Sequence, residues 1–142
     1  MPAALSAEGS FRQKQRVKQR QRRAPAVREE LLQASIVDYL EAVLRHRLVF
    51  AIPNAARRTR TGRASNAIPG LLSGAPDLAL CLPHGRILWL EVKTASGVLS
   101  EQQRQVHQLL LDLGHKVAVV RAVEEVRDVL RLYCVPTREA KA

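Results

Sequence analysis

The stretch from residue 70 to residue 93 constrains the fold most, because it has the pattern of two strands joined by a tight turn. The segment Asp77 to Leu82 is apolar after its first residue. Pro83-His84-Gly85-Arg86 favours a turn, since proline fixes φ and glycine tolerates positive φ. The second arm, Ile87 to Lys93, is rich in β-branched and aromatic residues and has the length of one strand. The sequence therefore predicts a β-hairpin.

Strand alternation places charged residues of the second arm on one side. Because side chains alternate faces, Glu91 and Lys93 point the same way from a mostly apolar segment, where burial of charge is costly unless compensated. Asp77, at the start of the partner arm, can reach the same end. The carboxylates of Asp77 and Glu91, with the backbone carbonyl of Val92, form hard oxygen ligands of the kind that magnesium or manganese prefers. With Lys93 beside them, the pattern indicates phosphodiester hydrolysis, although a solvated Glu-x-Lys pair without a catalytic role is common on strands.

Four motifs in this order resemble a known family. They are Gly74-Ala-Pro-Asp77, Glu91-Val-Lys93, the segment from Gly97 to Gln103, and a helix that ends at Gly114. Together they resemble the VRR-NUC (virus-type replication-repair nuclease) branch of the PD-(D/E)xK nuclease superfamily, over about Arg28 to Leu132. The resemblance implies a restriction-endonuclease-like αβββαβ core.

The same resemblance implies a divalent-metal-dependent deoxyribonuclease with Mg²⁺ or Mn²⁺ as cofactor. It makes Asp77 and Glu91 metal ligands, Lys93 the catalytic lysine and Gln103 a supporting active-site residue. Branched or four-way-junction (Holliday junction) DNA, in replication, recombination or repair, is the implied substrate. A homodimer is the implied assembly.

A helix is predicted from about Arg28 to Arg45, with a buried stripe of apolar residues at helical spacing: Leu32, Ile36, Leu40 and Val43. Glu29 projects close to the middle of this stripe, whereas Glu30 falls at its edge. A carboxylate there either favours the helix dipole or reaches the metal site as a third acidic group. The family pattern of a glutamate four residues before a glutamine matches Glu29 and Gln33, so Glu29 is preferred over Glu30.

The remaining elements complete an α/β fold with a mixed sheet flanked by helices. Strands are predicted at Leu48 to Ile52 and Val117 to Val120, and a final helix at Val123 to Leu132. A strand, a helix and another strand imply a right-handed crossover that places the last strand parallel to its neighbour. Sheet edges in so small a chain need protection, and a second copy would supply it.

A helix is predicted to begin at Ser100, and the role of Gln103 in its first turn has more than one interpretation. Ser100 and Gln103 match a capping box, so Gln103 can cap the helix, lie at the site, or do both. An apolar face is predicted from Val106, Leu109, Leu110 and Leu113. His107 and His115 are interpreted as surface or helix-end groups, because no second His or Cys stands at a metal-ligand spacing.

Charge divides the chain into parts. Residues 1–28 carry +7 of the formal +10, and residues 1–27 are predicted to be a disordered basic tail that attracts polyanions. Residues 28–135 form the predicted nuclease domain and 136–142 a C-terminal tail.

With no apolar run of membrane-spanning length and no hydrophobic signal segment, we expect a cytoplasmic protein, with Cys81 and Cys134 as buried, reduced thiols.

DNA contacts are predicted in the loop after Pro53. Its candidate DNA-binding residues are Asn54, Arg57, Arg58, Arg60 and Arg63, since guanidinium groups suit phosphates. Aromatic residues are only 4% of the chain, so recognition is expected to rest on phosphates and DNA shape. A non-catalytic DNA-binding module and a sequence-specific restriction-type endonuclease of the same fold are the alternatives.

Overall fold

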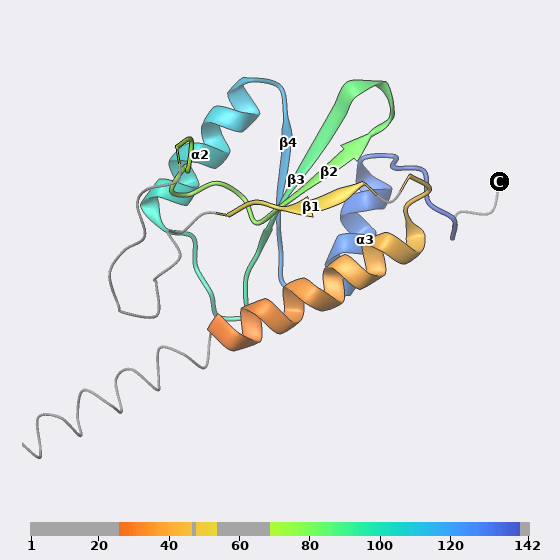
Figure 1. Cartoon of the computed structure of the whole chain (residues 1–142), viewed down its shortest axis with the longest axis horizontal. Helices are drawn as coiled ribbons and strands as arrows, with labels where there is room; N and C mark the ends of the chain where they lie inside the picture. The colour runs from red at the N-terminus through yellow and green to blue at the C-terminus, as the bar shows by residue number, and fades with distance from the viewer. Residues whose placement is uncertain (1–25, 47, 54–68, 140–142) are drawn as a thin grey trace, which may run out of the picture.

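A four-stranded mixed sheet forms the centre of the molecule (Figure 1). The computed structural model describes residues 26–46, 48–53 and 69–139. The strands lie in the order β1-β2-β3-β4; the first three are antiparallel neighbours, and β4 is parallel to β3. A helix over residues 26–43 precedes β1 (Val49–Ala51), β2 (Leu78–Leu82), β3 (Arg86–Val92), α2 (Glu101–Asp112), β4 (Lys116–Val120) and α3 (Val123–Leu132). The predicted α/β class and element order are confirmed.

The hydrophobic core lies on one face of this sheet. The helix over residues 26–43 and α3 cover that face, on the lower side of the sheet in Figure 1. The predicted stripe of the first helix is confirmed, since Ile36, Leu40 and Val43 are buried. The sheet and α3 contribute further fully or nearly fully buried side chains to the same cluster: Leu78, Leu80, Leu88, Leu90, Val92, Val120, Val126 and Leu130.

The hairpin of β2 and β3 turns through a short 3₁₀ helix, η1 (Pro83–Gly85). His84 and Gly85 both have positive φ, at 63° and 70°, which lets the chain reverse within three residues. Because Leu78 pairs with Leu90 in antiparallel register, the residues before β2 lie beside the last residues of β3. The hairpin therefore brings two sequence motifs to one end of the sheet.

Helix α2 lies on the opposite side of the sheet from the core, as the crossover between the parallel strands β3 and β4 requires. The predicted apolar face of this helix is wrong in part. Leu109 and Leu113 are 61% and 77% exposed, while His107 is the buried residue of α2. The reason is that the sheet presents Glu91 and Lys93 to this helix, so polar residues line its inner side.

The described part of the predicted C-terminal tail lies against the first helix. Thr137 forms an isolated β-bridge with Leu44, and the Arg138 N–H donates to the Val43 carbonyl at 2.8 Å. Both cysteines are free, but Cys134 is exposed at the end of α3, so its predicted burial is wrong. No helix among the described residues has the length and hydrophobicity that crossing a membrane requires.

Candidate active site

Asp77 lies where the hairpin register predicts, beside the end of β3. It directly precedes β2, and its Oδ2 accepts a hydrogen bond from the Val92 N–H at 2.8 Å. Its own carbonyl accepts one from the Ile52 N–H, which ties the end of β1 to the same point. The hydrogen bond to Val92 fixes the Asp77 carboxylate next to Glu91, where burial raises the Glu91 pKa and the Asp77 charge adds to that rise.

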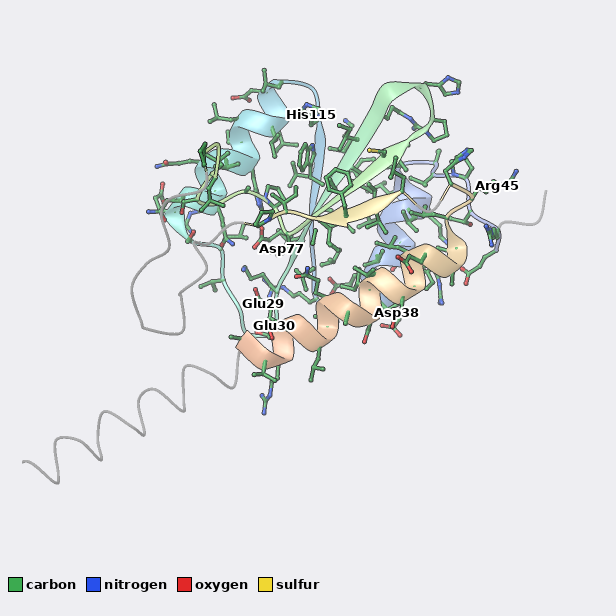
Figure 2. The ribbon with its side chains drawn as sticks, in the orientation of Figure 1. Glu29, Glu30, Asp38, Arg45, Asp77 and His115 are labelled. Atoms are coloured by element: carbon green, nitrogen blue, oxygen red, sulfur yellow. The ribbon has the colours of Figure 1, made fainter. Side chains whose placement is uncertain are left out.

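Glu91 and Lys93 are buried together, on the face of the sheet opposite the core. Glu91 is completely inaccessible to solvent, and its Oε1 lies 2.8 Å from the Lys93 ammonium. The same ammonium donates to Glu29 Oε1 at 3.3 Å. Glu29 projects from the helix toward Asp77 and the end of the sheet in Figure 2, whereas Glu30 is exposed. The helix thus supplies the third carboxylate, as the position of Glu29 on its apolar stripe predicts.

Gln103 performs both of the roles that its sequence position left open. Its backbone N–H donates to the Ser100 hydroxyl, and its side-chain oxygen accepts from the Ser100 N–H, which completes the capping box. Its Nε2 donates to Glu91 Oε1 at 2.5 Å. Because the cap uses the oxygen and the site uses the nitrogen, one amide orients the buried carboxylate and starts α2.

His107 also faces this site, and its interpretation as a surface or helix-end group is wrong. It is 7% exposed, and its Nε2 lies 3.4 Å from Glu91 Oε2. Four residues separate it from Gln103, so both side chains lie on one face of α2. This spacing is the signal that could have identified it. His115, by contrast, lies beyond α2 with its ring edge-on to Trp89, at 5.8 Å between centroids.

Burial and charge shift three pKa values in this cluster. Burial, opposed by the hydrogen bond from Lys93 and reinforced by the charge of Asp77, raises the pKa of Glu91 to about 7. Burial lowers the pKa of Lys93, but the hydrogen bond and charge of Glu91, with those of Glu29, outweigh burial and raise it overall. Burial also lowers the pKa of His107, which favours its neutral form. The site therefore gathers an ammonium and an imidazole around the same buried carboxyl group.

Comparison with known proteins places the chain in a family. The model of the VRR-NUC domain matches residues 12–124, most of the chain. This chain belongs to the VRR-NUC family. A solved structure described as a VRR_NUC domain protein is similar over 74% of this chain and 86% of its own, at 19% identity and a TM-score of 0.49. Among curated proteins, no sequence matches.

The two segments of this VRR-NUC chain that are predicted to contact DNA lie outside the described residues. One contains the candidate DNA-binding residues Asn54, Arg57, Arg58, Arg60 and Arg63, and the other is residues 1–25 of the predicted tail. Their contacts with DNA stay a prediction.

The VRR-NUC site offers oxygen ligands that suit a divalent cation. Glu91 Oε2 is buried without a hydrogen-bond partner in the structure, and Asp77 supplies a second carboxylate beside it. Among the described residues, no three His, Cys, Asp or Glu side chains lie close enough together to hold a cation as they stand. This set fits a cation that keeps several of its waters, as magnesium does, with one or two carboxylates from the protein.

Two contacts fix the loops next to the VRR-NUC site, one before β2 and one between Lys93 and α2. A Cβ on Gly74, whose φ is +87°, would lie 2.6 Å from the carbonyl carbon and oxygen of Gln102, so the loop before β2 approaches the α2 backbone closely. Arg121 Nη1 donates to the carbonyls of Thr94 and Gly97 at 2.6 and 2.7 Å. This guanidinium holds the loop that leads from Lys93 into α2.

The raised pKa of Glu91 predicts a pH-dependent stability in the cation-free protein. Between the usual value of 4.5 and about 7, the folded state keeps the Glu91 proton that the unfolded chain has released. Stability contributed by this group therefore falls as pH rises through that window, by about 3 kcal/mol in total, and then levels off. Glu91→Gln should remove this fall.

Urea unfolding in EDTA at pH 5.0 and 7.5 measures the effect as the difference between wild type and Glu91→Gln. Glu30→Gln, at an exposed position on the first helix, is the control and should keep the wild-type difference. Equal pH dependence in wild type and Glu91→Gln would contradict the prediction.

Proposed function

We propose that this chain is a divalent-metal-dependent DNA endonuclease that hydrolyses phosphodiester bonds with Mg²⁺ or Mn²⁺. The observation that carries the proposal is the buried Glu91, held by the Lys93 ammonium and the Gln103 amide beside Asp77. A buried carboxylate with this much compensation is unusual for a purely structural group and typical of a functional site.

The residues divide the work of hydrolysis. A cation bound by Asp77 and Glu91, with the Val92 carbonyl, would polarise the scissile phosphate and lower the pKa of water. Lys93 can orient the attacking water or donate to a phosphate oxygen as negative charge develops there. Gln103 holds Glu91 in one orientation, and Glu29 restrains the Lys93 ammonium at 3.3 Å. Each of these polar groups is in place before substrate arrives, which reduces reorganisation during the reaction.

The proposed substrate is branched or duplex DNA, recognised through its phosphates and shape. The net charge of +10 and the low aromatic content favour backbone contacts over base stacking. A homodimer would present two sites to such DNA and would cover one of the two edge strands, β1 or β4. A dimeric mass by light scattering across a concentration series is expected.

Cleavage of labelled DNA tests the proposal directly. Duplex, single-stranded and four-way-junction DNA would be incubated with Mg²⁺, Mn²⁺ or EDTA, using wild type, Asp77→Ala and Lys93→Ala. Metal-dependent cutting that both variants lose is the expected result, with the junction cut fastest. Binding without cutting by all three proteins in every metal would instead identify a non-catalytic DNA-binding module. Cutting that follows a short base sequence in any DNA form would identify a restriction-type enzyme.

Glu29 and its neighbour Glu30 provide a matched pair for the role of the first helix. Glu29→Gln removes the second carboxylate on Lys93 and should lower the cleavage rate by about tenfold, a typical effect for a residue that positions a catalytic group. Glu30→Gln, at an exposed position one residue away, should leave it unchanged. Single-turnover rates on the preferred DNA would measure both. Equal loss in the two variants, or none in Glu29→Gln, would remove Glu29 from the site.

A further inference from the structure

Two buried atoms in the site lack any hydrogen-bond partner in the structure. They are Oε2 of Glu91, whose residue is fully buried, and Nε2 of His107, which is 7% exposed. The two atoms lie 3.4 Å apart. At this separation the two atoms form no hydrogen bond with each other, and neither has another partner in the structure. They are therefore neighbours without being bonded to each other.

An unpaired polar atom in a protein interior costs about 1–3 kcal/mol, so two adjacent ones call for a physical explanation. A carboxylate oxygen and the lone pair of a neutral imidazole are both electron donors. One cation in contact with both would satisfy the two atoms together. Ligand distances of about 2.0–2.2 Å put neighbouring ligands of one cation roughly 3–3.5 Å apart, a range that includes the observed separation.

Neighbouring contacts hold both atoms in these positions. Glu91 Oε1 is already held by Lys93 and Gln103, which leaves Oε2 facing His107. His107 belongs to the same face of α2 as Gln103, and the capping box fixes the first turn of that helix. The close approach of Gly74 to the α2 backbone fixes the distance between the start of α2 and the loop before β2. The pair is held from both sides.

We propose that His107 Nε2 is a ligand of the divalent cation bound by Glu91 Oε2, and that the site consequently takes Mn²⁺ in preference to Mg²⁺. The inference rests on the proposed metal-dependent function and narrows its cofactor. Magnesium takes almost only oxygen ligands, whereas imidazole suits first-row transition metals. A nitrogen ligand in the site therefore discriminates between the two ions.

Direct binding of Mn²⁺ to the full chain without DNA tests the assignment. Wild type, His107→Gln and His46→Gln would be titrated with Mn²⁺ and with Mg²⁺ by calorimetry. Pulsed electron paramagnetic resonance would then detect coupling between bound Mn²⁺ and an imidazole nitrogen. His46 is exposed, so its replacement is the matched control. Circular dichroism and melting in EDTA would establish that each variant is folded.

In the expected result, wild type and His46→Gln bind Mn²⁺ more tightly than Mg²⁺ and show the nitrogen coupling. His107→Gln should lose the coupling and bind Mn²⁺ about tenfold more weakly or worse, with Mg²⁺ binding little changed. Unchanged Mn²⁺ affinity and coupling in folded His107→Gln would overturn the assignment, and metal-dependent cutting by wild type would then leave the proposed function intact. If wild type shows the expected binding pattern but cuts no DNA, the assignment of His107 as a ligand stands and the proposed nuclease function is contradicted.

Discussion

Replacing Lys93 with methionine should lower the rate of metal-dependent cleavage by about 10³-fold, the loss that removal of one charged or hydrogen-bonding group from a transition state commonly produces. Methionine keeps an unbranched side chain in the buried position but removes the ammonium that lies 2.8 Å from Glu91 and 3.3 Å from Glu29. Affinity for DNA should change little, because a single buried lysine contributes little to a surface that binds phosphates. The loss should therefore appear in the single-turnover rate.

Lys116→Met is the matched control for this experiment. Lys116 is exposed at the start of β4, where its ammonium lies over the Tyr133 ring. Cleavage by this variant should stay within about twofold of wild type, since surface substitutions away from a site are nearly neutral. Retention of more than a tenth of the wild-type rate by Lys93→Met would contradict the catalytic role. So would an equal loss in the control.

Gly74→Ala should be the most destabilising glycine-to-alanine substitution among the described glycines with positive φ. The added Cβ would meet the Gln102 backbone at 2.6 Å and the Gln103 nitrogen at 2.9 Å, and alanine is strained at a φ of +87°. Strain and overpacking together should cost about 3 kcal/mol, which corresponds to a fall of about 10 °C in melting temperature. Cleavage should fall as well, because displacement of α2 moves Gln103 away from Glu91.

Gly85→Ala and Gly114→Ala separate the two contributions to that cost. Both glycines have positive φ, at +70° and +87°, but a Cβ at either position would meet nothing within 4 Å. These variants should lose only about 1 kcal/mol from backbone strain. Thermal melts of the three variants in one buffer make the comparison. Melting of Gly74→Ala within a degree or two of the controls would show that α2 moves aside at little cost.

Much of the fold and part of the site could be predicted from sequence, because they depend on local patterns. Apolar run lengths and the Pro-His-Gly turn specify the hairpin, and strand alternation places Glu91 beside Lys93. The face of the first helix selects Glu29, since helical spacing fixes its direction within a few tens of degrees. These relations involve neighbours on one element or across one turn.

His107 and the outer face of α2 show what local patterns omit. The apolar stripe of Leu109 and Leu113 predicts burial, yet a helix buries the side that faces its neighbours. Here the neighbouring sheet presents charged groups, so the hydrogen-bonding side chains turn inward and the leucines remain outside. Only the tertiary contact between α2 and Glu91 decides this orientation. Cys134 is exposed for a local reason, since it lies where the chain leaves α3 with a φ of 50°.

In the metal-dependent nuclease proposed above, the Lys93 ammonium would make folding independent of metal binding. In zinc fingers, the ligands repel one another until the ion arrives, and the apoprotein is unfolded. Here a lysine from the chain itself lies between Glu91 and Glu29 and offsets part of their charge, so the fold closes around its own cation. Under the proposed metal-dependent function, the domain would fold first and bind its divalent ion afterwards, so the ion supply would control its activity without controlling its folding.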